Sequence, residues 1–370
     1  MNQTVTAATD TLFGRFFLPG PTEVRTEVLE AQTRAMIGHR GSLIQEFVSE
    51  LQQGLKKVFV TDRPVFISSS SASGLMEAAV RNGASGKVLS LVNGAFSHRF
   101  GDIARACALE VDEVAVPWGE AHDPAVVASA LAAGAYHAVT VVHSETSTGV
   151  LNDLASISQV VHEHEDTLLF VDSVSGAAGA ELQTDAGGLD HVLTGGQKAF
   201  SLPPGLAFCV ASDAMIERAK GIENRGYYFD LVRYEDNIKK LQTPTTPALS
   251  TLFALQVQLQ RMADETMEVR WVRHISMAER TWSWVDDMVT AGVPLGVTAA
   301  EGHRSPTVTA VVLPEGVTGP SVVGAVQERG WVIGGGYGKL KDTTFRIGHM
   351  GEHTMDELEA LLEVLTEVLA

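Results

Sequence analysis

Four short polar stretches carry the residues of this chain that could do chemistry. Lys198 stands in "TGGQKAF" (194–200), a turn with almost no other charge in it. Burial away from water lowers the pKa of an ammonium group, and a neutral lysine amine is a nucleophile toward aldehydes. The pattern therefore indicates a reactive amine, with a lysine on a surface loop as the alternative interpretation.

Asp172 ends the apolar run "LLFVD" (168–172). An ionised carboxylate buried at the end of a strand is costly unless a cation lies beside it. The neighbouring sequence supplies no lysine or arginine, so the pattern predicts a cationic partner from elsewhere. A structural aspartate that caps the following segment is the alternative.

A serine-rich turn, "SSSSASG" (68–74), joins a short predicted strand to a helix that starts near Ser73. Unpaired backbone N–H groups at a helix start, together with the hydroxyls of Ser71 and Ser73, form a favourable site for a phosphate. A helix cap without a ligand is the alternative. The turn "SETSTGV" (144–150) also follows an apolar strand, but alone it indicates little.

These polar stretches follow predicted strands that are apolar without alternation, as expected for strands covered on both faces. The strand candidates span residues 87–92, 137–142, 167–172, 191–194 and 206–210. Helices are predicted at 43–58, 97–108, 124–133 and 153–164. This alternation predicts an α/β fold with a mostly parallel sheet between helices, in which ligands bind at the carboxyl ends of the strands.

The pattern changes at about residue 248. Long helices are predicted at 248–263 and 266–290, followed by strands at 307–313 and 343–348 and helices at 319–329 and 354–369. We therefore expect three parts, which are an N-terminal arm (1–20), a large ligand-binding domain (21–250) and a smaller α+β domain (251–370).

Composition excludes several classes of function. The 370 residues carry a net charge of −18, which disfavours binding to nucleic acid. No apolar run approaches the length of about 20 residues that spans a bilayer, and the N-terminus lacks the features of a signal peptide. We therefore expect a cytoplasmic protein without a membrane or nucleic-acid partner. Cys107 and Cys209 are expected to be buried free thiols, and no metal site is expected.

One ligand requires all of these groups together. Pyridoxal 5′-phosphate needs an acid at its ring nitrogen, an amine at its aldehyde and hydrogen-bond donors at its phosphate. In this hypothesis Asp172 keeps the ring nitrogen protonated and Lys198 forms a Schiff base with the aldehyde. Ser71, Ala72 and Ser73 hold the phosphate.

The chain resembles the class V aminotransferases of fold type I, which include alanine–glyoxylate and serine–pyruvate aminotransferases. The matching stretches keep the family's order over nearly the whole chain: "LPGPTEV" (18–24), "IGHRG" (37–41), "SSASGLMEAAV" (70–80), "NGAFSHR" (93–99), "SETSTGVL" (144–151), "VDSVSG" (171–176), "TGGQKAFSLPPG" (194–205), "QTPTTPALS" (242–250) and "LKDTTFRIGHMG" (340–351). The resemblance implies a seven-stranded sheet in the large domain and a pyridoxal phosphate cofactor.

The same resemblance implies roles for further residues at the cofactor. Phe96 and Val174 would pack on the two faces of the ring, Thr146 would hydrogen-bond its phenolic oxygen, and Gln197 would reach the phosphate. Phe96 stands where the family often has Trp, and it keeps the stacking surface but lacks an indole N–H. Ala72 stands where the family often has Gly, and we expect phosphate binding to survive this change.

Arg346, in the strand motif "TFRIG", would bind the α-carboxylate of the substrate, because the guanidinium fork matches a carboxylate. An intramolecular salt bridge is the alternative.

The resemblance also implies a homodimer, in which Thr246 and Thr243 complete the phosphate site of the second subunit. His39 and Arg40 resemble the pair with which phosphoserine aminotransferases hold a substrate phosphate. The pair also occurs in relatives that act on plain amino acids, and it could instead form a local ion pair or a helix-entry contact.

The implied reaction is transamination from a small amino acid, alanine or serine, to glyoxylate or pyruvate, in two half-reactions. The alternative is a phosphoserine aminotransferase that uses 2-oxoglutarate. Cysteine desulfuration is a remote alternative, because it needs a nucleophilic cysteine on a late loop and Cys209 lies in an apolar predicted strand. A binding module without activity would be expected to have lost Lys198 or Asp172. The stretch "GGGYGKLK" (334–341) departs from the phosphate-binding loop motif, and we interpret it as a mobile loop near the substrate.

Overall fold

The computed structural model describes residues 12–370, so the first eleven residues of the predicted arm lie outside the described part. Its centre is a seven-stranded sheet in the order β2-β10-β9-β8-β5-β3-β4. The strands are β2 (Val65–Ser68), β3 (Val88–Val92), β4 (Val111–Ala115), β5 (Ala138–Val142), β8 (Leu168–Asp172), β9 (His191–Gly195) and β10 (Ala207–Ala211). Strand β10 is antiparallel to both neighbours, and the other pairs are parallel. The predicted α/β fold with a mostly parallel seven-stranded sheet is confirmed.

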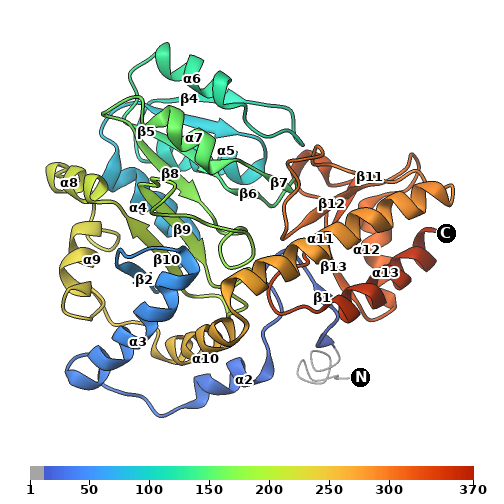
Figure 1. Cartoon of the computed structure of the whole chain (residues 1–370), viewed down its shortest axis with the longest axis horizontal. Helices are drawn as coiled ribbons and strands as arrows, with labels where there is room; N and C mark the ends of the chain where they lie inside the picture. Colours follow the sequence, from blue (N-terminus) through green and yellow to red (C-terminus); the bar gives the residue numbers. More distant parts are fainter. Residues whose placement is uncertain (1–11) are drawn as a thin grey trace.

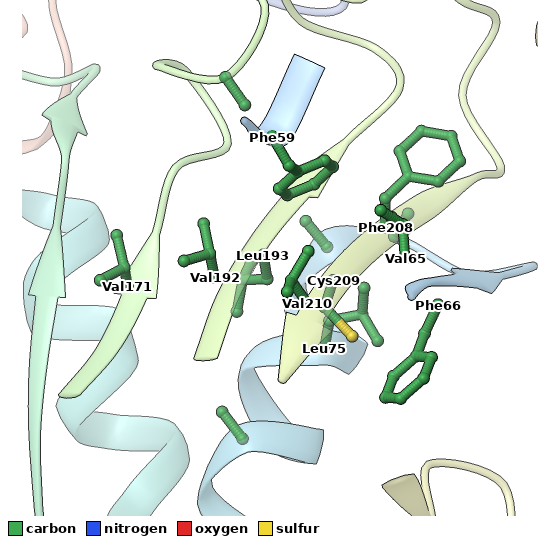
Figure 2. Packing of buried hydrophobic residues seen from close by; sticks show 14 of the residues in the cluster. Phe59, Val65, Phe66, Leu75, Val171, Val192, Leu193, Phe208, Cys209 and Val210 are labelled. Atoms are coloured by element: carbon green, nitrogen blue, oxygen red, sulfur yellow. The ribbon is translucent and has the colours of Figure 1, made fainter. Parts of the chain in front are cut away.

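The strands of this sheet are apolar because helices cover both of its faces. Every residue of β3, β5, β8, β9 and β10 is buried. Figure 2 shows the side chains of Val171, Val192 and Leu193 on neighbouring strands, with Leu75 and Phe59 packed nearby from two helices. The sequence analysis missed β4, an edge strand whose residues are partly exposed and include two acids.

The covering helices are α3 (Ser42–Phe59), α4 (Ala72–Gly83), α5 (Ala95–Ala106), α6 (Pro124–Ala132), α7 (Leu154–Val161), α8 (Asp213–Gly221) and α9 (Leu231–Ile238). Helices α3, α5, α6 and α7 lie close to their predicted ranges and α4 begins near its predicted start, whereas α8 and α9 were not predicted. Side chains of Asp123, Asp153, Ser212 and Asp230 accept backbone N–H groups at four of the helix starts. These caps satisfy N–H groups that have no partner within the helix, and they set where each helix begins.

A second, five-stranded sheet has the order β1-β13-β14-β12-β11. Its strands are β1 (Phe16–Phe17), β11 (Gly296–Val297), β12 (Thr309–Val312), β13 (Val332–Gly335) and β14 (Thr344–Ile347). The later helices are α10 (Leu249–Glu265), α11 (Met267–Thr290), α12 (Gly319–Glu328) and α13 (Met355–Leu369). Strand β1 runs parallel to β13, so the start of the described chain joins the sheet formed by its end.

Buried side chains form two apolar clusters, one around each sheet. Helix α11 runs from the large sheet toward the small one (Figure 1), and its residues enter both clusters. The predicted division of the chain at residue 250 stays a prediction. In residues 12–370, none of the helices has the length and apolar character that crossing a membrane would require.

Arg270 on α11 joins three loops and is 0% exposed. Its Nε donates to the carbonyl of Ala178 at 2.9 Å, and its Nη2 donates to the carbonyls of Ala199 at 2.8 Å and Gly351 at 3.2 Å. These carbonyls belong to the loops that follow β8, β9 and β14. One buried guanidinium therefore holds together the segments next to Asp172, Lys198 and Arg346.

Replacing this guanidinium should destabilise the protein strongly. Nη1 of Arg270 also pairs with Glu265 at 2.9 Å and with Glu352 at 2.8 Å. We expect Arg270→Met to lower the free energy of unfolding by about 3–5 kcal/mol, because it takes the donor from the buried carbonyls of Ala178 and Ala199 and removes one cation from Glu265 and Glu352. The matched control is Arg280→Met on the same helix, whose pair with Glu359 is partly exposed, and it should cost at most about 1 kcal/mol. Denaturant unfolding measures both losses, and equal small losses would contradict this role of Arg270.

Candidate active site

A cavity opens where the strands of the large sheet end. Its wall contains most of the predicted site residues, which are Ser71, Ala72, Ser73, Phe96, Thr146, Asp172, Val174, Gln197 and Lys198. They lie at the end of β8 and in the loops and helix starts that follow β2, β3, β5, β8 and β9, which meet at one edge because these strands run in the same direction. A larger cavity, of about 620 Å³, lies beside α3, α10 and the start of α11 and contains none of the predicted residues.

Lys198 is 8% exposed, so it does not lie on an exposed surface loop. Burial lowers the pKa of its ammonium group to about 7, and the positive charge of Arg346 lowers it further, whereas Asp172 acts in the opposite direction. Near neutral pH a large fraction of this amine is therefore unprotonated. Its Nζ donates a hydrogen bond to the carbonyl oxygen of Pro19.

The segment around Gly20 closes the site next to this lysine. Thr22 donates its hydroxyl to the carbonyl of Lys198 at 2.8 Å and its N–H to the carbonyl of Gln197 at 3.0 Å. Gly20 has a φ of +103°, and a side chain there would collide with the lysine. The segment "LPGP" therefore contacts the amine directly, which the sequence analysis did not predict.

Asp172 is the last residue of β8 and is 3% exposed. The pKa of its carboxyl group is raised to about 7, mainly by burial, and the charge of Glu145 acts in the same direction. One of its oxygens accepts the N–H of Val174 at 2.7 Å. Among residues 12–370, no lysine or arginine forms a salt bridge with this carboxylate. It therefore suits a ligand that brings a protonated nitrogen, as the pyridoxal phosphate ring does.

The start of α4 forms another part of the cavity wall. Ser71 takes an extended conformation and precedes the first helical residue, Ala72. The first N–H groups of a helix have no partner within it, and the exposed side chains of Ser71 and Ser73 add two hydroxyls. Such a helix start suits a phosphate. The departure at Ala72 leaves these donors in place, and the residues of the cavity fit pyridoxal phosphate at both ends.

Glu145 was missed as a site residue, although it fixes the position of Phe96. Its carboxylate is 0% exposed and accepts the backbone N–H groups of Phe96 at 3.1 Å and Ser97 at 2.9 Å. It also accepts the hydroxyl of Ser147 at 2.6 Å. A carboxylate at the start of α5 is favourable, because unpaired N–H groups point toward it. The available signal was an acid three residues after the apolar strand β5.

Thr146 and Val174 also line the cavity, and a second hydroxyl supports Thr146. The side chain of Thr146 forms a hydrogen bond with that of Ser175, another cavity residue that the sequence analysis did not single out. The carbonyl of Thr146 accepts Nη1 of Arg346 at 3.2 Å. This contact joins the strand motif of the small sheet to the wall of the cavity.

Arg346 lies on β14, just outside the cavity wall, and is 9% exposed. Its Nε donates to the carbonyl of Gly335 at 2.8 Å. Burial lowers the pKa of the guanidinium to about 10. The described part of the chain offers it no carboxylate within salt-bridge distance, so the intramolecular salt bridge considered as the alternative is absent there. A buried guanidinium without an acid is suited to an anionic ligand.

Besides Arg346, four of the predicted residues lie outside the cavity wall of their own chain, namely His39, Arg40, Thr243 and Thr246. Thr246 Oγ1 lies 3.5 Å from His39 Nε2, and Arg40 donates to the carbonyl of His39 at 2.8 Å. Thr243 is buried and donates to the carbonyl of Thr245. Their expected role at the site of a second subunit stays a prediction.

The cysteines do not offer a nucleophile. Cys209 is 0% exposed within β10, and burial raises the pKa of its thiol. Cys107 is only half-buried, so the expectation that both thiols are buried is wrong for this one. Neither cysteine lies in the wall of the candidate active site.

Residues 29–333 match the family described as "Aminotransferase class-V", and the chain therefore belongs to the class V aminotransferases. An uncharacterized aminotransferase of Methanocaldococcus jannaschii is 36% identical over 340 residues, which cover 90% of this chain and 87% of that protein. The L-aspartate–glyoxylate aminotransferase of Paracoccus denitrificans is 32% identical, and the match covers 91% of this chain and 86% of that protein. The serine–glyoxylate aminotransferase of Arabidopsis thaliana is also 32% identical, and the match covers 93% of this chain and 87% of that protein.

Among solved structures, the alanine–glyoxylate aminotransferase of Nostoc sp. superposes with a TM-score of 0.89 at 28% identity, covering 96% of this chain and 95% of that one. The protein is thus an aminotransferase of fold type I that depends on pyridoxal phosphate. These findings confirm the family, the fold and the cofactor expected from the sequence.

The low pKa of Lys198 predicts a characteristic labelling profile. After removal of the cofactor, an amine-reactive reagent should modify Lys198 with a midpoint near pH 7, because its ammonium is desolvated. Arg346→Met should raise this midpoint by removing a positive charge, and Asp172→Asn should lower it by removing a negative one. Peptide mass spectrometry follows the modification. The internal control is Lys87, whose pKa is raised by Asp112 and Glu110, and which should react only at higher pH.

Proposed function

We propose that this enzyme transfers the amino group of a small amino acid, alanine or serine, to a small 2-oxo acid, glyoxylate or pyruvate. The observation that carries the proposal is one buried cavity holding a largely neutral lysine, a buried carboxylate and the open start of a helix. Relatives named for aspartate, serine and alanine share glyoxylate in their names, which favours glyoxylate as the acceptor.

Each residue of the cavity would have a separate task. When bound, pyridoxal phosphate supplies an electron-accepting ring that stabilises negative charge at the α-carbon of the substrate. Asp172 would hold the proton on the ring nitrogen, and the start of α4 with Gln197 would hold the phosphate. Phe96 and Val174 would confine the ring from its two faces, and Thr146 would hold its phenolic oxygen.

Lys198 would have two tasks in the reaction. Its amine would anchor the aldehyde of the cofactor, and the amino group of the substrate would displace it. The displaced amine, neutral because it is buried, would then take the proton from the substrate α-carbon. Arg346 would hold the α-carboxylate in both halves of the reaction, since the amino acid and the 2-oxo acid carry the same group.

The phosphoserine alternative has no support from the cavity of the single chain. His39 and Arg40 would have to hold the substrate phosphate, but neither lies in the cavity wall. A phosphoserine substrate would therefore depend on these residues arriving from a second subunit. The desulfuration alternative requires a nucleophilic cysteine, which the buried Cys209 does not provide.

We also propose that the enzyme is a homodimer and that Thr246 reaches the phosphate of the partner's site. Thr246 is exposed and lies next to His39, near the start of α10. Large apolar side chains of the neighbouring segments are exposed, including Met36 at 64% and Leu43 at 58%. A second copy that covers this surface would bury them and bring the threonine to a new site.

The function is tested by a panel of amino donors against glyoxylate, pyruvate and 2-oxoglutarate. We expect alanine and serine with glyoxylate to give the highest kcat/KM values and phosphoserine to be a poor donor. Lys198→Ala should fold and lose turnover by at least about 1,000-fold, because the group that moves the proton is gone. Turnover by this variant close to that of the parent enzyme would contradict the proposal, as would a large preference for phosphoserine.

The shared phosphate site predicts that Thr246→Glu weakens cofactor binding. A carboxylate placed beside the phosphate should raise the dissociation constant of pyridoxal phosphate at least about tenfold, through like-charge repulsion. The control is Ser129→Glu, which adds the same charge on the exposed surface of α6 and should change nothing. Fluorescence titration measures the affinity, and sedimentation measures the oligomeric state. Equal affinities in a dimeric Thr246→Glu variant would contradict the shared site.

A further inference from the structure

Tyr337 lies between the proposed carboxylate-binding residue and the cofactor cavity. It follows β13, in the glycine-rich stretch 334–341. Its ring centroid is 5.2 Å from that of Phe96, and the Cζ atom of Arg346 lies 5.3 Å from the same ring. The side chain therefore contacts a residue of the cavity wall on one side and the guanidinium on the other.

Contacts with the large domain hold this ring in place. Nη2 of Arg99, on α5, donates a hydrogen bond to the hydroxyl of Tyr337 at 3.2 Å. The guanidinium of Arg99 also lies 4.8 Å from the centroid of the Phe96 ring, so both residues belong to one cluster. Arg99 itself lines the cavity.

The outer side of the same loop is also anchored. Nζ of Lys339 lies 4.6 Å from the ring centroid of Trp118, and a side chain at Gly338 would contact the same indole. On the inner side, the carbonyl of Gly335 accepts Nε of Arg346. The tyrosine is thus fixed between contacts on both sides, and its ring acts as a wall of defined position.

We propose that Tyr337 is a specificity-determining residue that limits the size of the substrate side chain. The inference depends on the proposed role of Arg346. A substrate whose carboxylate contacts Arg346 and whose amino group faces Lys198 must pass beside the ring of Tyr337. Atoms beyond the β-carbon then meet this ring and that of Phe96. The side chains of alanine and serine end at or just beyond the β-carbon, whereas that of leucine branches farther out.

We expect the size of the ring, and not its hydroxyl, to limit the size of the substrate side chain. Tyr337→Phe keeps the ring and loses only the hydrogen bond from Arg99, so the preference for small donors should remain. Tyr337→Ala removes the ring and should open space between Phe96 and Arg346. The ratio of kcat/KM between two substrates changes by roughly 10-fold or more for each methylene that a pocket excludes or admits.

The test uses the holoenzyme, with alanine and leucine as donors to glyoxylate. In Tyr337→Ala, the ratio of kcat/KM for leucine to that for alanine should rise at least about tenfold. In Tyr337→Phe it should stay within about threefold. Lys341→Met, which changes an exposed side chain at the end of the same stretch, is the matched control and should leave the ratio unchanged.

Binding of unreactive acids gives a second measurement without turnover. Calorimetry of the holoenzyme compares the dissociation constants of propionate and 3-phenylpropionate. Tyr337→Ala should strengthen binding of 3-phenylpropionate relative to propionate at least about tenfold. Unchanged ratios in both experiments would overturn the role of Tyr337.

A fourth variant, at Arg346, separates this outcome from failure of the proposed function. Arg346→Lys should weaken the binding of both acids, because the bidentate contact is lost. If Arg346→Lys leaves both acids binding as in the parent enzyme, the proposed carboxylate site is wrong, whatever the size ratios show. If Arg346→Lys weakens both acids and Tyr337→Ala leaves the size ratios unchanged, only the inference about Tyr337 is overturned.

Discussion

The site depends on charge that is buried without full compensation. Lys198 and Asp172 face the same cavity, and the burial of each opposes its ionised form, so the pKa values of both lie near 7. In water this lysine would be a cation and this aspartate an anion. A ligand that brings a protonated nitrogen and an aldehyde suits both groups, because it gives the carboxylate a partner and uses the neutral amine. The same burial therefore gives a site that suits this cofactor and an amine that can act as a nucleophile.

Such an arrangement persists only if the loops that carry it cannot move apart. Arg270 contacts the loops after β8, β9 and β14 from a position with no exposure to water. Glu145 fixes the start of α5, and with it the ring of Phe96. Both are charged groups whose burial would be unfavourable without these hydrogen bonds, and their energetic cost is offset by the contacts that hold the cavity together.

Much of the large sheet and of the candidate site was predictable, because the strands of this sheet have a strong sequence pattern. Strands buried on both faces are continuous apolar runs, and the polar residue after each run lies at the edge of the sheet where ligands bind. Asp172, Lys198 and the turn at Ser71 were found in this way. Strand β4 was missed because an edge strand does not need to be apolar on both faces. Glu145 was missed because an acid after a strand is also typical of an ordinary turn.

The sequence by itself determined the fold class, the family and the cofactor, since these depend on local pattern and on residue type. Tertiary structure alone decided which distant segments meet. Pro19 against Lys198, Arg346 against Thr146 and Tyr337 between Phe96 and Arg346 are contacts across long stretches of chain. No local pattern encodes such contacts, because they arise from the packing of the two sheets and from the pairing of β1, near the start of the chain, with β13, near its end.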